Sequence, residues 1–308
     1  MPFDYMNLPT DAFEAHFNPR EAATEVDEKV ARMGDASRQV RAQYAHSADV
    51  RYGAGARQTL DIFPPLPQPP ARTTSAPLAR PVQLFVHGGF WRAMSKDDYS
   101  FIAPPYLEAG GCAVIINYDL APTVTLDEIV AQTIESVAWT YRNIAQHGGD
   151  PNKLYMSGNS AGAHLVAMAL AHDWEADGLP ADIIKGATPI TGVMDCAPVL
   201  NISVNKDVRL DAEMAARNSP IFHLPRRALP LIIAVGGSEP TGWVELSRAY
   251  MRACEAAGLA PRYMEIPGLD HFDISAAMGD PHSPLTHAII EQMGLQLPLI
   301  EPDPINAN

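Results

Sequence analysis

Cysteine is scarce in this chain. Only three occur among 308 residues, Cys112, Cys196 and Cys254, and they are widely spaced. An odd and scattered set does not form a disulfide framework, and no CxxC or HxxxH pair marks a metal site. We therefore expect reduced thiols, a cytoplasmic location, and neither a metal nor another cofactor.

Long apolar runs and basic residues are also lacking. No stretch approaches the roughly 18 apolar residues that a membrane span needs, and the first residues show no basic start followed by an apolar core, as a signal peptide would. Lys and Arg number 22 against 36 Asp and Glu, which gives a formal charge of −14. Nucleic acid and anionic membranes are therefore not expected as partners.

Apolar runs alternate with helical patterns along most of the chain. This alternation predicts an α/β fold, a mostly parallel central sheet flanked by helices, in one domain over 48–308. An N-terminal helical extension (1–47) precedes the domain, and an insertion at about 195–229 is the expected cap. The expected helices are 20–44, 126–146 and 161–170, a Pro-rich loop is expected at 64–81, and the expected strands are 50–52, 58–63, 82–86, 112–118, 153–156, 183–193, 230–235 and 262–266.

Ser160 lies in the pentapeptide Gly158-Asn159-Ser160-Ala161-Gly162, directly after an apolar run. A nucleophilic serine on a sharp turn between a strand and a helix needs small neighbours, because the turn is strained and its flanks pack closely. The pattern therefore predicts the nucleophile elbow of an α/β-hydrolase. By itself a GxSxG match is a weak signal, but here a strand precedes it and a helix follows.

A second motif lies upstream, where the strand 82–86 runs into His87-Gly88-Gly89. Such a loop supplies backbone N–H groups to the oxyanion hole of lipase- and esterase-like hydrolases. We expect the donors to be Gly88, Gly89 and Ala161, the last being the residue after the nucleophile. If the elbow were absent, we would interpret Gly88 and Gly89 as an ordinary turn after a strand.

The general base is expected to follow the nucleophile in the chain order Ser, acid, His. Of ten histidines, His271 stands on the loop after the apparent last strand, where the base belongs. His282 and His287 come later and rank below it. His164, one helical turn after Ser160, is expected to be a packed helix residue.

Glu239 is the expected acid, because it follows the strand 230–235. It would hold the imidazole of His271 in the required tautomer and stabilise the imidazolium that forms. Asp270 and Asp273 flank the histidine and are alternatives. We expect these two to be solvated loop carboxylates.

Several residues are expected to line the substrate pocket. Phe90, Trp91 and Trp243 would offer ring faces to an aromatic substrate, and Tyr118 and Asn159 would offer hydrogen bonds. Core packing is an equal alternative for Trp91 and Trp243, and a turn-stabilising role is an equal alternative for Asn159.

Four segments together resemble the arylformamidase (kynurenine formamidase) group of α/β-hydrolases, and the resemblance runs from about residue 18 to beyond His271. They are Asn18-Pro19-Arg20, the HGGFW stretch 87–91, Asn117-Tyr118-Asp119-Leu120-Ala121-Pro122 and the elbow 157–165. The resemblance implies the same Ser160, Glu239 and His271 triad and the same oxyanion donors. The chain departs from the family pattern at Phe90, where Tyr is common, at Asn159, where His is common, and at Glu239, where Asp is usual.

Three functions follow as hypotheses. The first is a serine hydrolase that cleaves an aryl formamide or related aryl amide, such as N-formylkynurenine, through an acyl-enzyme. The second is a carboxylesterase of small acyl esters on the same triad. The third, a non-catalytic binding protein, fits poorly because both Ser160 and His271 are present. A small molecule is the expected partner, and a homodimer is an assembly that the sequence allows.

Overall fold

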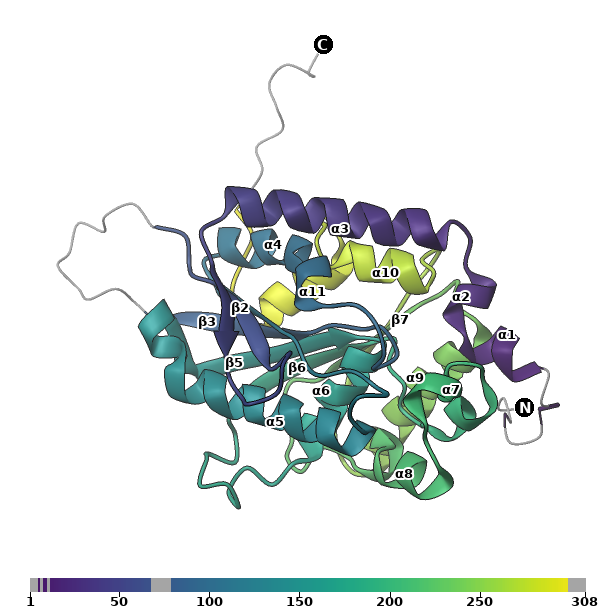
Figure 1. Cartoon of the computed structure of the whole chain (residues 1–308). Coiled ribbons are helices and arrows are strands. Elements are labelled where there is room, and N and C mark those ends of the chain that lie inside the picture. The colour runs from purple at the N-terminus through teal and green to yellow at the C-terminus, as the bar shows by residue number, and fades with distance from the viewer. Residues whose placement is uncertain (1–4, 6–7, 10–11, 68–78, 299–308) are drawn as a thin grey trace, which may run out of the picture.

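A mixed sheet runs through the middle of the protein, with helices on both faces (Figure 1). The structure is a computed structural model that describes residues 5, 8–9, 12–67 and 79–298. The strands are β1 (Ser47–Arg51), β2 (Thr59–Phe63), β3 (Arg80–Val86), β4 (Cys112–Ile116), β5 (Gly149–Asn159), β6 (Ile184–Ile190), β7 (Ile232–Gly236) and β8 (Arg262–Ile266). Their order across the sheet is β1-β2-β4-β3-β5-β6-β7-β8. Only the first two pairings, β1 with β2 and β2 with β4, are antiparallel; every later pairing is parallel.

Most of each central strand is buried because helices cover both sides of the sheet; β5 is exposed only at Asn152 and Lys153, near its start. β4 and β7 consist almost entirely of apolar residues, and every residue in them is buried. The two edge strands differ: β1 and β8 carry polar and charged side chains and are partly exposed. Charged edges of this kind disfavour pairing with another chain.

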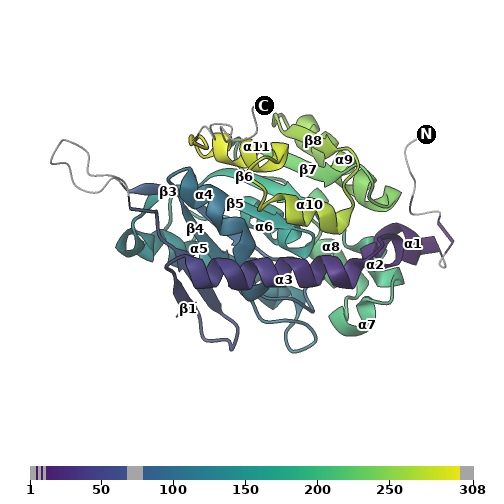
Figure 2. The same cartoon turned by 90° about the horizontal axis from the view of Figure 1, so that it is seen from above.

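The helices divide between the two faces of the sheet, as Figures 1 and 2 show. α3, α4, α10 and α11 build one apolar core and α5, α6 and α9 belong to the other. Their bounds are α1 (Phe13–Phe17), α2 (Pro19–Ala22), α3 (Val26–Gln43), α4 (Ala103–Glu108), α5 (Leu126–Asn143), α6 (Ala161–Ala171), α7 (Asn205–Val208), α8 (Ala212–Arg217), α9 (Thr241–Ala256), α10 (His271–Ala277) and α11 (Pro284–Gln292). Short 3-10 turns are η3 (Lys96–Asp98), η4 (Ser100–Ile102), η5 (Ile144–His147), η6 (Ala197–Asn201) and η7 (Pro220–Phe222).

The expected α/β fold is confirmed, and three expected elements need correction. The helix predicted over 20–44 is broken between α2 and α3, where Glu25 has a left-handed φ of 54°. The strand predicted over 183–193 stops at Ile190, because Thr191 turns away with a φ of 47°. Arg80 and Pro81, expected at the end of the Pro-rich loop, begin β3 instead; residues 68–78 of that loop lie outside the described residues.

The N-terminal segment and the expected cap lie together near the ends of the strands. The expected cap forms η6, α7, α8 and η7, and α1 contacts both η6 and α9. Phe13 and Phe17 of α1 are buried in the same apolar core as the sheet and α9. The N-terminal segment therefore meets the cap above the carboxyl ends of the parallel strands.

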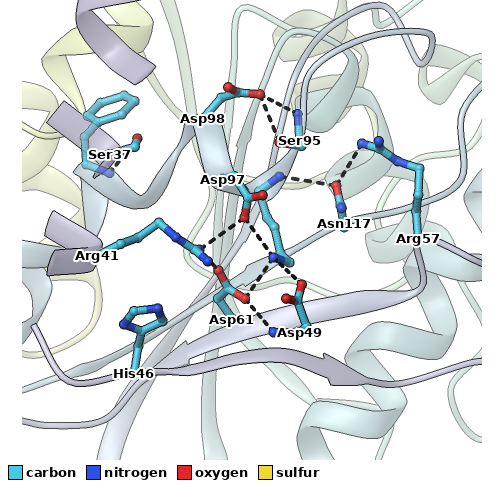
Figure 3. A network of polar contacts seen from close by, with 12 residues as sticks. Ser37, Arg41, His46, Asp49, Arg57, Asp61, Ser95, Asp97, Asp98 and Asn117 are labelled. Carbon is cyan, nitrogen blue, oxygen red and sulfur yellow. Dashed lines mark hydrogen bonds and ion pairs between the residues drawn. The ribbon is translucent and has the colours of Figure 1, made fainter. Parts of the chain in front are cut away.

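An ionic cluster centred on the buried side chains of Lys96 and Asp61 attaches the C-terminal half of α3 to the sheet (Figure 3). Arg41 of α3 pairs with Asp61 of β2 and, at 3.1 Å, with Asp97. The Nζ atom of Lys96 lies 2.8 Å from Asp49, 3.0 Å from Asp61 and 2.9 Å from Asp97. Burial by itself lowers the pKa of Lys96, but hydrogen bonds to the three carboxylates outweigh it and raise that pKa. The cluster holds α3 in place, and α3 forms part of the pocket described next.

Candidate active site

Ser160 occupies a strained turn between β5 and α6. Its φ of 55° and ψ of −121° are unusual for a residue other than glycine. Its N–H donates to the carbonyl of Ile190 on the neighbouring strand at 2.9 Å, which holds the turn in place. This is the geometry of a nucleophile elbow.

The two glycines of the pentapeptide are required by packing. A Cβ on Gly162 would lie 2.0 Å from the carbonyl oxygen of Val86, at the end of β3. A Cβ on Gly158 would lie 2.7 Å from the backbone of Gly162. The first turn of α6 therefore packs directly on β3, and only glycine fits at either position.

His271 begins α10, and its side chain is joined to Glu239. The Nδ1 atom of His271 lies 2.8 Å from Oε2 of Glu239, and the two side chains are 6% and 0% exposed. The remaining carboxylate oxygen, Oε1, accepts hydrogen bonds from the hydroxyl of Thr191 and, at 3.2 Å, from the N–H of Gly236. Each oxygen of the buried carboxylate thus has a partner, as burial of a charge requires.

Thr191 was missed by the sequence analysis. It follows β6 directly, and its hydroxyl also lies 3.3 Å from Nδ1 of His271. A threonine after a strand carries no distinctive sequence signal. Its role becomes visible only because the left-handed turn at Thr191 aims the side chain at Glu239.

Asp270 and Asp273, the alternative acids, are tied to α3. The Nζ atom of Lys29 lies 2.5 Å from Asp270 and 2.8 Å from Asp273. Asp270 also caps α10 by accepting the N–H groups of Phe272 and Asp273, both at 2.9 Å. The expectation that these are solvated loop carboxylates is therefore wrong for Asp270, whose side chain is 16% exposed.

The predicted oxyanion donors are arranged unequally. Gly89 lines the pocket, and its φ of 108° and the position of Ala93, whose carbonyl would lie 2.2 Å from a Cβ, require glycine. Ala161 is fully buried at the start of α6, where helix N–H groups are not satisfied within the helix. Gly88 packs closely against Asn159, since a Cβ there would lie 3.0 Å from Nδ2 of Asn159; like Ala161 it is not among the lining residues, and its role as a donor stays a prediction.

A pocket of about 100 Å³ contains both Ser160 and His271. Aromatic rings of Phe90, Tyr99 and Phe272 line it. The N-terminal segment supplies another wall; its lining residues are Asn18, Pro19, Arg20, Val30 and Met33. Sequence reasoning noticed Asn18-Pro19-Arg20 only as a family feature, because its contact with the pocket depends on distant packing.

Of the five predicted substrate contacts, Phe90 and Asn159 line the pocket. Trp91, Tyr118 and Trp243 do not: all are at most 1% exposed and lie behind the lining residues, so this expectation is corrected. Trp91 packs edge-on against His164 at 4.9 Å between ring centroids. Core packing, the alternative for the two tryptophans, is what the structure shows.

Tyr118 and Trp243 support groups at the pocket. The hydroxyl of Tyr118 donates to the carbonyl of His87 at 2.8 Å, and its ring stacks on that of His87 at 4.2 Å. Burial lowers the pKa of His87 to about 4, so this residue of the glycine loop is neutral near pH 7. Trp243 lies between Phe90, at 5.8 Å, and His271, at 4.5 Å.

Asn159 links the elbow to α10. Its Nδ2 donates to Oγ of Ser275 at 2.8 Å and to the hydroxyl of Tyr99 at 3.3 Å. Ser275 in turn donates to the carbonyl of His271 at 2.9 Å. The residue before the nucleophile is thus connected to the residue that carries the imidazole, which supports the structural role considered for Asn159; its hydrogen bond to substrate stays a prediction.

Metal ligation and membrane spanning find no support in the part of the chain that the structure describes. There, no group of three or more His, Cys, Asp or Glu side chains could hold a metal ion. No described helix is both long enough and apolar enough to cross a bilayer. The three cysteines are buried thiols, and burial raises the pKa of Cys254 to about 11 and that of Cys112 to about 12.

Comparisons with known proteins agree with this geometry. The family described as the alpha/beta hydrolase fold matches residues 83–273. Kynurenine formamidase of Danio rerio is 30% identical over 303 residues, which are 94% of this chain and 99% of that protein. Esterase LipQ of Mycobacterium tuberculosis is 31% identical over 255 residues, 76% of this chain and 59% of the esterase.

Comparison with solved structures also finds proteins of similar fold. A protein of Silicibacter sp. TM1040 proposed to be a thioesterase superposes with a TM-score of 0.75 at 26% identity, over 91% of this chain and 98% of its own. The family match spans the elbow, the glycine loop, Glu239 and His271. The chain therefore belongs to the α/β-hydrolase fold family and is a hydrolase of the group that includes the kynurenine formamidases.

Proposed function

We propose that this hydrolase cleaves an aryl formamide or a related aryl amide through a covalent acyl-enzyme on Ser160. One observation carries the proposal: the strained turn at Ser160 opens into the same pocket as His271, whose imidazole is hydrogen-bonded to the buried Glu239. This arrangement supports the assignment of Ser160 as the nucleophile, His271 as the base and Glu239 as the acid that orients it.

In the first half of the proposed reaction, Oγ of Ser160 attacks the amide carbonyl carbon while Nε2 of His271 takes the hydroxyl proton. The tetrahedral oxyanion accepts hydrogen bonds from the N–H groups of Gly88, Gly89 and Ala161. When the C–N bond breaks, the imidazolium returns its proton to the aryl amine, and the acyl group stays on Ser160. Glu239 stabilises the imidazolium throughout.

In the second half, His271 takes a proton from water, and the resulting nucleophile attacks the acyl carbon. Collapse of this second tetrahedral intermediate breaks the C–O bond to Ser160, whose Oγ regains the proton from the imidazolium. For a formamide the products are formate and the aryl amine. No redox cofactor is needed, because acyl transfer involves no change in oxidation state.

The pocket lining supports an aromatic substrate, because Phe90, Tyr99 and Phe272 offer ring faces to an aryl leaving group. The full-length similarity to a kynurenine formamidase points in the same direction. N-formylkynurenine is thus the first substrate to test.

A carboxylesterase acting on small acyl esters is the second candidate. The same triad and oxyanion donors would serve it, and the similarity to esterase LipQ favours it. Esters demand less of the leaving-group step than amides, because an alkoxide or phenoxide departs more readily than an amide nitrogen.

The deciding experiment compares kcat/KM for N-formylkynurenine and p-nitrophenyl acetate, with Ser160→Ala as the blank and Ser203→Ala, an exposed cap serine outside the pocket lining, as the matched control. We expect a large preference for the formamide and a loss of at least about 1,000-fold in Ser160→Ala. Fast ester turnover with negligible deformylation would show that the protein is a carboxylesterase, the second candidate. Substantial turnover by Ser160→Ala would refute the mechanism, and no labelling of Ser160 by a fluorophosphonate would indicate a binding protein.

We propose that the substrate is a small molecule and that the protein acts in the cytoplasm. Three buried cysteines without a disulfide suit a reducing compartment. Cell fractionation with an antibody against the full chain tests the location directly.

A further inference from the structure

The loop that carries Gly89 is strained beyond the glycine itself. Gly89 has a φ of 108°, and three residues with side chains follow it in left-handed conformations: Phe90 with a φ of 48°, Trp91 with 57° and Met94 with 69°. Such conformations are costly for residues other than glycine, and they persist only where the surrounding structure holds them. The loop 89–94 therefore depends on contacts from outside it to keep its backbone N–H groups in place.

The segment 117–121, which follows β4, holds the first part of this loop. The hydroxyl of Tyr118 donates to the carbonyl of His87 at 2.8 Å, and the N–H of Ala121 donates to the carbonyl of Trp91 at 2.9 Å. These two bonds fix the loop before and just after its glycines. The far end of the loop, at Met94, needs a different contact.

Arg57 provides the contact at the far end. It stands in the turn between β1 and β2 and is half-buried. Its Nη2 donates to the carbonyl of Met94 at 2.6 Å and to Oδ1 of Asn117 at 3.1 Å, and its Nε donates to the carbonyl of Tyr118 at 3.0 Å (Figure 3 shows the bond to Asn117). One guanidinium group thus joins the end of the strained loop to the segment 117–121.

Asn117 completes this clamp. Its Oδ1 also accepts the backbone N–H of Lys96 at 3.2 Å, so the chain is held on both sides of the turn that ends the loop (Figure 3). The backbone of Arg57 is itself fixed, because its N–H donates to Oδ1 of Asp119 at 2.8 Å. A planar guanidinium presents several donors at fixed angles, whereas a lysine ammonium does not.

We propose that Arg57 is a positioning residue for the oxyanion hole: it holds the loop 89–94 in its strained conformation and thereby keeps the N–H of Gly89 directed at the oxyanion. The proposal rests on the proposed function, because that oxyanion forms at Ser160. Arg57 is not among the residues that line the pocket, so it acts through the loop. A fixed donor stabilises the charge that develops in the transition state more than the ground-state carbonyl, so its displacement lowers kcat and leaves KM nearly unchanged.

The test measures kcat and KM of Arg57→Gln with whichever of N-formylkynurenine and p-nitrophenyl acetate the wild type cleaves faster. Each kcat is divided by the fraction of Ser160 that a fluorophosphonate labels at completion, which removes the effect of misfolded molecules. We expect kcat to fall about tenfold or more, with KM within about twofold of the wild type. Arg57→Lys should give a kcat between the two, because an ammonium group replaces only part of the fork.

Arg51→Gln is the matched control. Arg51 belongs to the same hairpin, at the end of β1, and its guanidinium also donates to backbone carbonyls, those of Ala54 at 3.3 Å and Gly55 at 2.9 Å. These carbonyls lie in the hairpin and not in the glycine loop. The substitution removes the same charge and the same kind of bond, and it should leave both kcat and KM unchanged.

Equal kcat values in Arg57→Gln and Arg51→Gln would overturn the proposal and leave the hydrolase intact. A raised KM with an unchanged kcat would also overturn it, because Arg57 would then serve substrate binding. If Arg57→Gln does not fold, Arg57→Lys and Arg51→Lys replace the pair, with the same criteria.

Hydrogen exchange separates this proposal from the proposed function. If the wild type cleaves neither the formamide nor the ester, the proposed function fails, and the clamp is judged from the loop alone. The amides of residues 89–96 should then exchange about tenfold faster in Arg57→Lys than in Arg51→Lys, while those of β3 exchange equally. Equal exchange of residues 89–96 in the two variants would refute the clamp.

Discussion

Lys29 and Asp270, 241 residues apart in the chain, form an ion pair at 2.5 Å that joins α3 to the first turn of α10. Lys29 also lies 2.8 Å from Asp273. His271 stands between these two aspartates in sequence, so a cation from the N-terminal segment neutralises the carboxylates beside the proposed base. Burial raises the pKa of Asp270, but hydrogen bonds from Lys29 and from backbone N–H groups outweigh it and hold that pKa below its usual value.

Lys29→Met should change the pH dependence of stability. The ammonium group helps to hold the pKa of Asp270 below its usual value, so the ion pair contributes stability that is present above that usual value and is lost as the pH falls through the lowered one. We expect the free energy of unfolding of Lys29→Met to be lower than that of the wild type near pH 7 and to decrease less as the pH falls from about 5 to about 2, measured by chemical denaturation. Lys29→Arg should restore the pH dependence of the wild type. Parallel curves for Lys29→Met and the wild type would show that the ion pair with Asp270 does not govern this pH range.

Glu239→Gln should reduce kcat strongly without unfolding the protein. The amide keeps the shape of the side chain but loses the charge that stabilises the imidazolium. We expect a loss of about 100-fold or more, measured at saturating substrate. Thr191→Val, which removes a single donor to the carboxylate, should cost about tenfold. A normal rate in Glu239→Gln would exclude it as the acid and redirect attention to Asp270 or Asp273.

Gly162→Ala should damage both folding and activity, because its Cβ would lie 2.0 Å from the carbonyl oxygen of Val86. α6 would have to move away from β3, and the N–H of Ala161 would move with it. We expect a loss of stability of about 2 kcal/mol or more, measured by chemical denaturation, together with a large drop in kcat.

Gly178→Ala is the matched control for that substitution. Gly178 has a φ of 69°, but nothing lies within 4 Å of the position of its Cβ. It should therefore cost only the backbone strain of about 1 kcal/mol and leave kcat unchanged. Equal losses in the two variants would mean that close packing at Gly162 is not what the elbow requires.

The loss of folding stability at acid pH should depend on His164. Burial lowers the pKa of His164 to about 4, although its Nε2–H donates to the carbonyl of Asn218 at 2.6 Å. The unfolded chain therefore binds this proton first, with a pKa near 6.5, and stability falls as the pH drops from there towards 4. The full effect is about 3 kcal/mol. His164→Gln keeps an N–H donor but does not titrate, so its Tm should fall less than that of the wild type between pH 7 and pH 4.5. Parallel falls would show that other groups govern acid unfolding.

Much of the fold and the order of the proposed triad follow from the sequence, because both rest on local patterns. Buried strands such as β4 are apolar runs in the sequence. The elbow is likewise recognisable from five neighbouring residues, although the requirement for glycine at position 162 comes from its packing on β3. Ser160, Glu239 and His271 each follow a parallel strand, and the carboxyl ends of parallel strands meet at one edge of the sheet. Their order along the chain could therefore be used to predict that they lie together. These features could be named from neighbours in the chain.

The tertiary structure alone decided what surrounds the proposed triad. Asn18, Arg20 and Met33 reach the pocket only because α3 crosses one face of the sheet and is held at both ends, by Lys29 and by Arg41. Thr191 touches Glu239, and Trp91 and Trp243 lie behind the lining instead of in it, because of packing between residues far apart in the chain. Local pattern determines secondary structure and turn chemistry, whereas the walls of a pocket depend on which distant side chains the folded core brings together.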